Sequence, residues 1–591
     1  MENKGKREDQ MNDPVLLPAP QSYQATGVKV PFQRLDKPEI IIDSVAVGHP
    51  QGYRLTVAPE GVKIVAADEA GAFYAQKTLK QLKTCYAGQS EVEGAEIFDY
   101  PVVLERGIML ETLSGAVIQF DKLKEFVEMM ADLKLNVLAL YIEHTFAFRD
   151  HEEVWRDASP YTHEQILELD AFCRERFIEL VPYLETFGHM HQWLKHDRYR
   201  PMAEVPEGWN HGFSVAPQPF TLCPSDPRSI EFLDGLYREI HEVFSSKKML
   251  VGCDETDDLG KGRSKELCDR IGVGNVYVDF VNLIDERVRA LGCETQIFGD
   301  VVVKHPQALQ RLHREVVIAH WGYEADFPFD EHCQLFKELG FSFYLLPSTS
   351  AYHSFIGRTA RGMGNIQNAV TNAVKHGARG VVNTQWNYRY NLTTIFDIPF
   401  FAYGAALCWQ PEANFEEAKL TRGLDTHIFK DASGRFAAFL LELGRAFEPV
   451  AYKSNHYNPV YLTFYQCEQG KEHESFQSLD PAKLEAVLMR VRELEAELDS
   501  IHPTASRTAV WERGVRFGIK IFLCAGEALL ALARDARAQK FHQLAPEVKA
   551  DFRRRYLDLR REYEALWHVD NRPGGIALTL EWFDKMLGEL E

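Results

Sequence analysis

The sequence predicts an α/β protein built on a (β/α)8 barrel, with a small α/β domain before the barrel and a helical region after it. Three observations predict this architecture. Between Arg106 and about Glu412, eight short apolar runs alternate with amphipathic segments, which suits a closed barrel better than an open sheet. Strand-like pieces and one helix precede this part, and only helical patterns follow it. The chain of 591 residues is also too long for a single core, so several domains are expected.

Residues 1–13 are hydrophilic and are predicted to form a disordered tail, and residues 14–100 are predicted to form the small α/β domain. "EIIIDSVAVG" and "GYRLTVAPEGVKIVAA" are typical of strands, and "EAGAFYAQKTLKQLKT" places its apolar residues on one face of a helix. The barrel is predicted over residues 101–412.

The eight predicted barrel strands are short apolar runs that each end in polar, charged or aromatic residues. They are "RGIMLE", "NVLALYIE", "IELVPYLE", "MLVGCDE", "TQIFGD", "VVIAHWG", "FSFYLLP" and "GVVNTQW". In a barrel of parallel strands these ends open onto one face, where the active site of such folds lies. Residues 413–591, with "PAKLEAVLMRVRELEAELDSI" and "DFRRRYLDLRREYEALW", are predicted to be helical.

Composition excludes several classes of function. A formal net charge of -20 argues against a nucleic-acid partner, because phosphates are bound by clustered Lys and Arg. No apolar stretch is long enough to cross a bilayer, and the N-terminus lacks the apolar core of a secretory signal. The ten cysteines are scattered and show no metal-like spacing, which favours reduced thiols and a cytoplasmic location.

The predicted strand ends bring together a set of side chains that suits a carbohydrate. Aromatic rings stack on the apolar faces of sugars, while carboxylates and imidazoles hydrogen-bond the hydroxyl rim. The set consists of Glu111, Glu143, His144, Glu185, Asp254, Glu255, Asp300, Trp321, the Ser348–Tyr352 loop and Trp386.

Asp254 and Glu255 are adjacent, and this adjacency points to a particular chemistry. Ordinary two-carboxylate glycosidases hold the two groups about 5 Å or more apart, on opposite sides of the bond. Neighbouring residues cannot easily straddle a sugar. The pair fits better if the substrate supplies its own nucleophile, such as a 2-acetamido oxygen, with Glu255 as the acid and Asp254 orienting that group.

Four segments resemble glycoside hydrolase family 20, the β-N-acetylhexosaminidases. "GYRLTVAPEGVKIVAADEAGAFYAQKTLKQL" resembles the family's accessory domain, "ERGIMLETLSG" its first barrel strand, "IELVPYLETFGHMHQWL" its third and "MLVGCDE" its catalytic strand. The resemblance implies that Arg106 grips sugar hydroxyls and that Asp254 orients the acetamide. It also implies that Glu255 is the acid and base, with His189 as the family's histidine and Glu185 in the place of its usual aspartate.

Some positions depart from the family's pattern, and others fit it in two ways. The fifth strand reads "QIFGDVVV", with Phe298 where a tryptophan is usual and Asp300 retained, and the eighth keeps Trp386 without the acid that commonly follows it. The family's acidic position in "YIEHTF" is either Glu143 or His144. Its acetamide-clasping tyrosine is either Tyr352 or Tyr344, and Tyr388 and Arg389 are candidates to replace the missing acid.

Several residues also have a structural interpretation. Asp257 and Asp258 are predicted to be solvated residues at the start of the next helix, and Arg106 could form an ion pair within the barrel. Trp155, Trp193 and Trp209 fit rim contacts or loop packing equally, and "NRPGG" at Asn571 is predicted to be a loop between helices. His189 and His191, two apart, leave open a metal-dependent hydrolase.

The sequence therefore predicts an exo-acting, retaining β-N-acetylhexosaminidase for terminal GlcNAc or GalNAc that needs no cofactor and no metal. Its predicted catalytic residues are Asp254 and Glu255. Its predicted substrate-binding residues are Arg106, Glu143, His144, Glu185, His189, Asp300, Trp321, Tyr352 and Trp386. An exo-glycosidase of the same fold for a modified or non-acetamido sugar is also open, as is an inactive sugar-binding barrel. The expected partner is a carbohydrate, without nucleic acid or membrane, and a homodimer is allowed for.

Overall fold

A computed structural model describes residues 14–112, 115–211, 216–386, 394–448, 450, 458–473, 476 and 479–591. The first part of the chain forms a five-stranded sheet with strand order β1-β5-β3-β4-β2. Its strands are β1 (Ser22–Pro31), β2 (Glu39–Ile42), β3 (Tyr53–Ala58), β4 (Gly61–Ala66) and β5 (Glu91–Asp99). Helix α3 (Glu69–Cys85) buries the face that carries Ala72, Tyr74, Ala75 and Leu79 against this sheet. Short helices η1 (Phe32–Asp36) and α2 (Ser44–Val47) complete the accessory domain.

Eight parallel strands then close into a barrel, which confirms the predicted fold class. They are β6 (Glu105–Glu111), β7 (Val137–Ile142), β8 (Glu179–Leu184), β9 (Lys248–Leu250), β10 (Glu294–Phe298), β11 (Val317–Trp321), β12 (Phe343–Leu346) and β13 (Gly380–Gln385). Closure joins β9 to β10, with Met249 opposite Thr295. The strands are mainly apolar because one face fills the barrel and the other packs against the helices.

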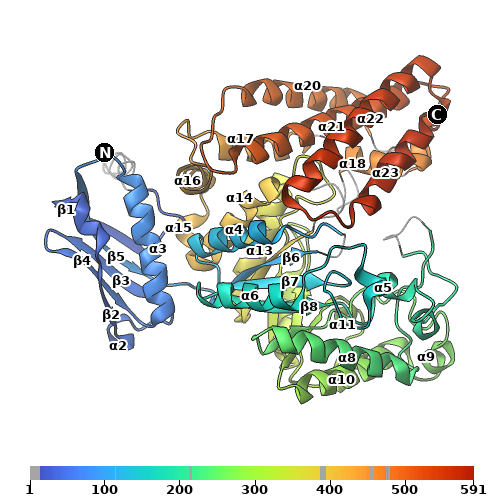
Figure 1. The fold of residues 1–591 in the computed structure, drawn as a ribbon, viewed down its shortest axis with the longest axis horizontal. Coiled ribbons are helices and arrows are strands. Elements are labelled where there is room, and N and C mark those ends of the chain that lie inside the picture. The colour runs from blue at the N-terminus through green and yellow to red at the C-terminus, as the bar shows by residue number, and fades with distance from the viewer. Residues whose placement is uncertain are drawn as a thin grey trace.

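Helices cover the outside of the barrel (Figure 1). They are α4 (Phe120–Asp132), α6 (His163–Arg174), α8 (Pro227–Val243), α10 (Val273–Ala290), α11 (Asp300–Lys304), α12 (Phe329–Glu338), α13 (Thr359–His376) and α14 (Ile398–Trp409). Shorter helices lie in the connections: α5 (Glu152–Trp155), α7 (His191–Leu194), η2 (Arg200–Met202), α9 (Lys265–Ile271), η3 (Ala308–Arg311) and η4 (Thr394–Phe396).

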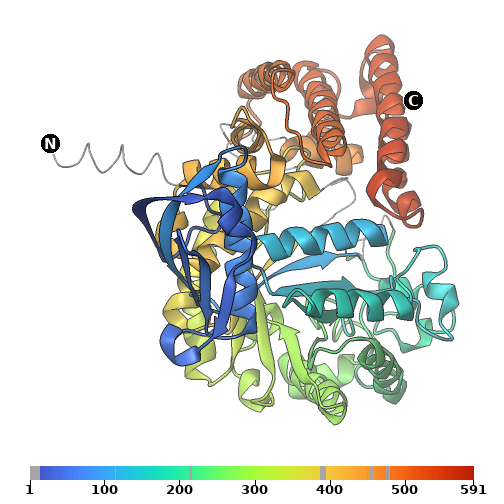
Figure 2. The ribbon, with the colours of Figure 1, turned by 60° about the vertical axis from the view of Figure 1, so that its left-hand side comes forward.

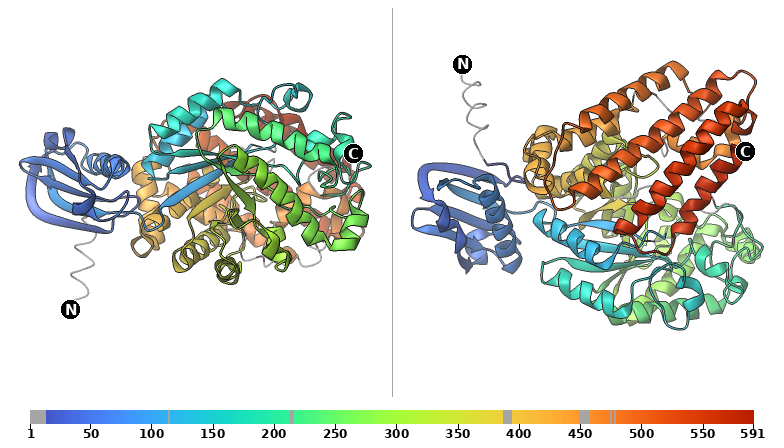
Figure 3. Two further views of the ribbon diagram at one scale, coloured as in Figure 1. Left: turned by 90° about the horizontal axis from the view of Figure 1, so that it is seen from below. Right: turned by 45° about the horizontal axis from the view of Figure 1, so that its top comes forward.

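The rest of the described chain is helical. Its helices are α15 (Pro411–Asn414), α16 (Glu417–Leu424), η5 (Asp425–Phe429), α17 (Phe436–Arg445), α18 (Pro459–Tyr465), η6 (Cys467–Glu472), α20 (Pro481–Leu498), α21 (Thr508–Arg534), η7 (Phe541–Gln543), α22 (Pro546–Asp570) and α23 (Ile576–Glu589). Figure 3 shows α20 to α23 as a layer of long helices lying along one side of the barrel. Within the described ranges, no helix combines the length and apolar character needed to span a membrane.

The accessory domain lies at the amino ends of the barrel strands (Figures 1 and 2). Its buried Asp99 forms an ion pair with Lys134, at the turn before β7, with 2.9 Å between carboxylate and ammonium. Trp409, at the end of α14, donates its indole N–H to the other oxygen of Asp99 at 2.6 Å. The opposite, carboxyl end of the barrel carries the predicted site.

Candidate active site

A left-handed turn follows β9 and carries Asp254 and Glu255. Gly252, Cys253 and Glu255 have φ values of 66°, 71° and 48°, a region that residues other than glycine seldom adopt. A side chain at Gly252 would place its Cβ 2.3 Å from the carboxylate oxygens of Glu185, so this position needs glycine. The turn gives the two acids different surroundings: Asp254 is 5% exposed, whereas the Glu255 side chain is 34% exposed.

Glu255 is held from two sides. His189 Nε2 lies 3.0 Å from Glu255 Oε2. The backbone N–H of Glu255 donates to Asp300 Oδ2 at 3.4 Å. The ammonium of Lys304 lies 3.3 Å from the same Asp300 oxygen. Burial raises the pKa of Asp300 to about 6, against the opposing charge of Lys304. Asp300 is therefore in contact with the turn that carries Asp254 and Glu255.

A chain of charged groups leads from Glu255 into the barrel. His189 Nδ1 lies 3.9 Å from Glu143 Oε1, so the imidazole stands between two carboxyl groups. Burial opposes a charged ring, but the hydrogen bond to Glu255 and the charges of Asp254, Glu255 and Glu143 raise the pKa of His189 to about 9. Burial raises the pKa of Glu143 to about 8. A proton can therefore be held along this line near neutral pH.

His144 follows Glu143 and is neutral. Its Nδ1 lies 3.8 Å from Glu143 Oε2, and burial lowers its pKa to about 3. Of these two candidates for the acidic position, Glu143 is the one whose carboxylate faces His189, at 3.9 Å.

Two more buried acids line the inside of the barrel. Tyr141 donates its hydroxyl to Glu185 Oε1 at 2.6 Å. Burial raises the pKa of Glu185 well above its usual range. Burial and the charge of Glu185 do the same for Asp254. Mutual repulsion keeps these buried acids from all being ionised at once, so the site can hold protons on some carboxyl groups while others carry charge.

Aromatic rings form the other wall. Trp321 stacks on Tyr323 with 5.2 Å between ring centroids and an angle of 20°. Tyr352 meets Tyr323 edge to face at 5.8 Å, and Trp386 meets Tyr141 at 5.4 Å and 90°. These side chains belong to the cluster that fills the inside of the barrel. The ends of β7, β11, β12 and β13 thus offer ring faces opposite the acids of β7 to β10.

The prediction that Arg106 binds sugar is wrong. Arg106 is the second residue of β6 and lies at the amino end of the barrel, fully buried. Its guanidinium donates to Gln51 Oε1 and to the Leu104 carbonyl, each at 2.9 Å, and lies over the ring of Trp409 at 4.7 Å. It joins the barrel to the accessory domain, because a residue that opens a strand cannot reach the face where the strand ends.

The prediction for Asp257 and Asp258 is wrong about the helix start for both acids and about solvation for Asp258. The next helix, α9, begins only at Lys265, and both acids lie in the turn before it. Asp257 is exposed, but Asp258 is fully buried and accepts a hydrogen bond from the Thr221 N–H at 3.4 Å.

Tyr352, and not Tyr344, lies on the aromatic wall. Tyr344 donates to Glu105 Oε2 at 2.6 Å, at the amino end of the barrel. Tyr388 and Arg389, with the rest of the Asn387–Asn391 loop, lie outside the described residues.

His191 and Trp193 pack within α7, the short helix that follows β8. His191 stacks on Phe220 with 6.1 Å between ring centroids. Trp193 is fully buried, with its indole N–H on the Glu143 carbonyl at 3.2 Å. Trp193 therefore supports the loops of the site as a packing residue.

Two residues of the site were not predicted from the sequence, Tyr141 and Tyr323. The alternation in "NVLALYIE" places Tyr141 on the same strand face as Glu143, which was the available signal. Tyr323 follows Trp321 by two residues in "HWGYE", and the same spacing could have indicated it.

The donor set also permits a cation. Among the described residues, His189, Asp254 and Glu255 form a group whose ligand atoms lie within 4.8 Å of one another. His191, on which the metal hypothesis partly rested, is not in this group.

The chain matches two models of one family. Residues 105–393 match the glycosyl hydrolase family 20 catalytic domain, and residues 14–100 match domain 2 of the same family. A β-hexosaminidase of Akkermansia muciniphila is 30% identical over 34% of this chain and 45% of its own length. A lacto-N-biosidase of Bifidobacterium bifidum is 25% identical over 46% of this chain and 24% of its own length. The chain thus spans less than half the length of either relative.

Solved structures show the same fold. A chitobiase of Flavobacterium johnsoniae superimposes with a TM-score of 0.58 at 17% identity, over 94% of this chain and 98% of its own. The Streptomyces plicatus N-acetyl-β-hexosaminidase gives a TM-score of 0.56 at 18% identity, over 72% of this chain and 96% of its own. With both family models matched in chain order and the barrel closed as described, the chain belongs to glycosyl hydrolase family 20.

Proposed function

We propose that this protein is an exo-acting, retaining β-N-acetylhexosaminidase that releases terminal β-linked GlcNAc or GalNAc by substrate-assisted catalysis. The observation that carries the proposal is the unequal placement of two adjacent acids. Asp254 is buried inside the barrel, and Glu255 reaches the mouth of the site. This difference supports a division of roles in which Asp254 holds a group of the substrate and Glu255 reaches the leaving oxygen.

In the proposed reaction, Glu255 donates a proton to the glycosidic oxygen as the acetamido oxygen of the substrate attacks the anomeric carbon. The bond to the leaving group breaks, and an oxazolinium ion forms. Asp254 holds the acetamide N–H and stabilises the positive charge. Glu255, now ionised, takes a proton from water, which opens the ring with retained configuration.

His189 supports both protonation states of Glu255. Its Nε2 lies on Glu255 at 3.0 Å, and its other nitrogen faces Glu143. A charged imidazole stabilises the carboxylate left after proton donation. The pKa of Glu143 is raised to about 8. Glu143 can therefore gain or lose a proton near neutral pH and balance part of the charge on His189.

The aromatic wall supports a sugar substrate. Trp321, Tyr323, Tyr352 and Trp386 present ring faces and edges toward the inside of the barrel. A pyranose ring packed there has its apolar face covered, while Glu185 and Asp300 lie on the acidic side. Comparing hydrolysis of the two substrates decides whether the protein prefers GlcNAc or GalNAc.

The test is hydrolysis of chromogenic β-GlcNAc, β-GalNAc and β-Glc substrates by wild type and Glu255→Gln. We expect hydrolysis of the acetamido substrates only, with a loss of about 10²–10³ in kcat for Glu255→Gln. Equal hydrolysis of β-Glc would favour a non-acetamido sugar. Binding of the sugars without hydrolysis of any substrate would favour an inactive sugar-binding barrel.

A metal-dependent hydrolase is the second candidate, supported by the grouping of His189, Asp254 and Glu255. The same assays with and without a chelator test it: lost activity that divalent cations restore would favour this candidate. A cytoplasmic location is also proposed, supported by ten free cysteines, nine of them buried. Assembly as a homodimer stays a prediction that the mass of the protein in solution would test.

A further inference from the structure

The sequence "NRPGG", residues 571–575, connects α22 to α23 in the C-terminal helical region. This region follows the ranges matched by the two family models, which end at residue 393. Besides joining the two helices, the loop packs against another part of the chain. It lies against the connections that follow β6 and β7, at the carboxyl end of the barrel.

Backbone hydrogen bonds tie the loop to the connection after β6. The Arg572 N–H donates to the Val117 carbonyl at 2.7 Å, and the Gln119 N–H donates to the Asp570 carbonyl at 2.7 Å. Ile118 and Asn571 form an antiparallel bridge. The two chains are so close that a Cβ at Gly575, whose φ is +79°, would lie 2.2 Å from the Gly115 carbonyl oxygen.

The same loop holds the connection after β7. The Gly575 N–H donates to the Asp157 carbonyl at 3.2 Å, and the Gly574 N–H donates to Ser159 Oγ at 2.9 Å. Arg572 donates to the Pro160 carbonyl at 2.6 Å and to Gln165 Oε1 at 2.8 Å. Its guanidinium also lies 4.4 Å over the ring of Tyr161.

Tyr161 connects the loop to the residues that follow Glu143. Its N–H donates to the Thr145 carbonyl at 3.0 Å, and its carbonyl accepts from the Ala147 N–H at 3.0 Å. Thr145 lies two residues after Glu143, and its hydroxyl shares a hydrogen bond of 2.7 Å with that of Thr112, just after β6. The Tyr161 hydroxyl donates to the Ile118 carbonyl at 2.8 Å, so both connections and the loop form one unit.

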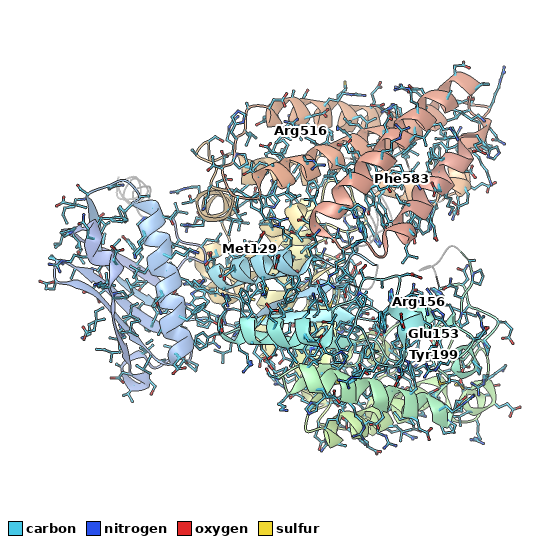
Figure 4. The ribbon with its side chains drawn as sticks, in the orientation of Figure 1. Met129, Glu153, Arg156, Tyr199, Arg516 and Phe583 are labelled. Carbon is cyan, nitrogen blue, oxygen red and sulfur yellow. The ribbon has the colours of Figure 1, made fainter. Side chains whose placement is uncertain are left out.

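The surroundings of this unit can be followed in Figure 4, which labels residues on neighbouring elements. Glu153 and Arg156, which belong to the connection after β7, lie together with Tyr199 at the barrel end away from the accessory domain. Phe583 marks α23, which the loop begins, while Arg516 lies farther away on α21.

We infer that the Asn571–Gly575 loop is a positioning element of the active site: through Arg572 and Tyr161 it fixes the end of β7, and with it Glu143 opposite His189. The inference rests on the proposed function. It makes the C-terminal helical region part of the frame that holds the catalytic groups. A loop that merely joined two helices would need neither the close glycine contacts nor three polar contacts from one arginine.

The experiment compares Arg572→Ala and Arg572→Lys with a matched control, Arg516→Ala, which removes an exposed pair with Asp499 (2.8 Å) on the same helical region. Each full-length variant is assayed on chromogenic β-GlcNAc for kcat, KM and the pH dependence of kcat. We expect Arg572→Ala to lower kcat about tenfold, with a small change in KM and a displaced limb in the pH profile. Arg572→Lys should recover part of kcat, and the control should match wild type.

A double-mutant cycle identifies Glu143 as the group through which Arg572 acts. If Arg572 acts through Glu143, adding Arg572→Ala to Glu143→Gln lowers kcat little beyond Glu143→Gln alone. Independent effects that multiply, or an unchanged kcat in Arg572→Ala, would overturn the inference.

Hydrogen exchange separates this inference from the proposed function. Arg572→Ala should speed exchange of the Ala147 and Tyr161 amides, while Arg516→Ala should leave it as in wild type. A wild type that hydrolyses none of the substrates would refute the proposed function, and the exchange result would still decide whether the loop holds the end of β7. Unchanged exchange at both amides would count against the loop as a positioning element.

Discussion

The two ends of the barrel bury charged groups in opposite ways. At the amino end, Lys134 and Asp99 are 1% and 0% exposed and form an ion pair of 2.9 Å. Tyr53 and Trp409 complete the hydrogen bonds of Asp99. Each buried charge there faces an opposite charge or a polar group, as stability requires.

At the carboxyl end, like charges gather. Glu143, Glu185, Asp254 and Asp300 are all buried, and within the described residues each has at least one carboxylate oxygen that accepts no hydrogen bond. Two basic groups lie beside these acids: His189 between Glu143 and Glu255, and Lys304 next to Asp300. Such an arrangement costs folding free energy, so its presence in a folded chain indicates a site that a substrate completes. The comparison predicts opposite outcomes for neutralising one charge at each end.

The largest expected effect is at the amino end. Lys134→Met leaves Asp99 buried without its cation and should lower the free energy of unfolding by about 3–5 kcal/mol. Denaturant titration measures this loss, and the kcat of the folded protein should stay at the wild-type value. Lys134→Met combined with Asp99→Asn should recover part of the stability, because no unpaired charge remains. A loss of activity larger than the loss of folded protein would contradict the assignment of this end to stability alone.

At the carboxyl end, Asp254→Asn should show the reverse. We expect kcat on chromogenic β-GlcNAc to fall about 10²–10³-fold, since a group that stabilises the transition state is lost. The midpoint of thermal unfolding should stay or rise, because a buried carboxylate beside Glu185 and Asp300 is neutralised. Activity near that of wild type, or a large fall in the midpoint, would remove the distinction between the two ends.

The same contrast explains how far the sequence could predict this molecule. The barrel follows from eight apolar runs because strand burial dictates composition, and the strand that ends in Asp254 and Glu255 locates the site. Arg106 was misplaced because the resemblance to the family motif was followed, although its place at the start of the first strand puts it at the amino end of the barrel. The burial of Asp258 depends on Thr221, 37 residues earlier, and no local pattern encodes such a contact. The NRPGG loop meets the barrel across more than 400 residues of sequence, so composition identified a loop and could not identify its partner.

A smaller effect is expected from the hydroxyl of Tyr277, which supports the left-handed turn from outside. Tyr277 on α10 is buried and donates to the Cys253 carbonyl at 2.8 Å. Tyr277→Phe removes that bond from a backbone in a costly conformation and should lower kcat about tenfold, for a stability loss of about 1 kcal/mol. Tyr403→Phe, on α14 with its hydroxyl 3.5 Å from Gln367, is the control and should leave kcat unchanged. Equal kcat in both variants would mean that the turn keeps its conformation without the hydrogen bond from Tyr277.

A pH dependence of stability is also expected, and it belongs to the carboxyl end. The pKa of His189 is raised from 6.5 to about 9, and that of Glu143 from 4.5 to about 8. A pKa raised in the folded state stabilises the protein fully below the unfolded value, and the stabilisation is lost as pH rises through the folded value. His189 therefore contributes a loss between about pH 6.5 and 9, and Glu143 a loss between about pH 4.5 and 8. The midpoint of thermal unfolding of wild type should fall across this window. His189→Gln should flatten the fall between about pH 7 and 9, and adding Glu143→Gln should flatten the part below about pH 7, whereas Arg516→Ala should keep the wild-type slope. A slope that survives in the double variant would place the responsible groups outside the Glu143–His189 pair, and the charge gathered at this end would then have to be balanced elsewhere in the site.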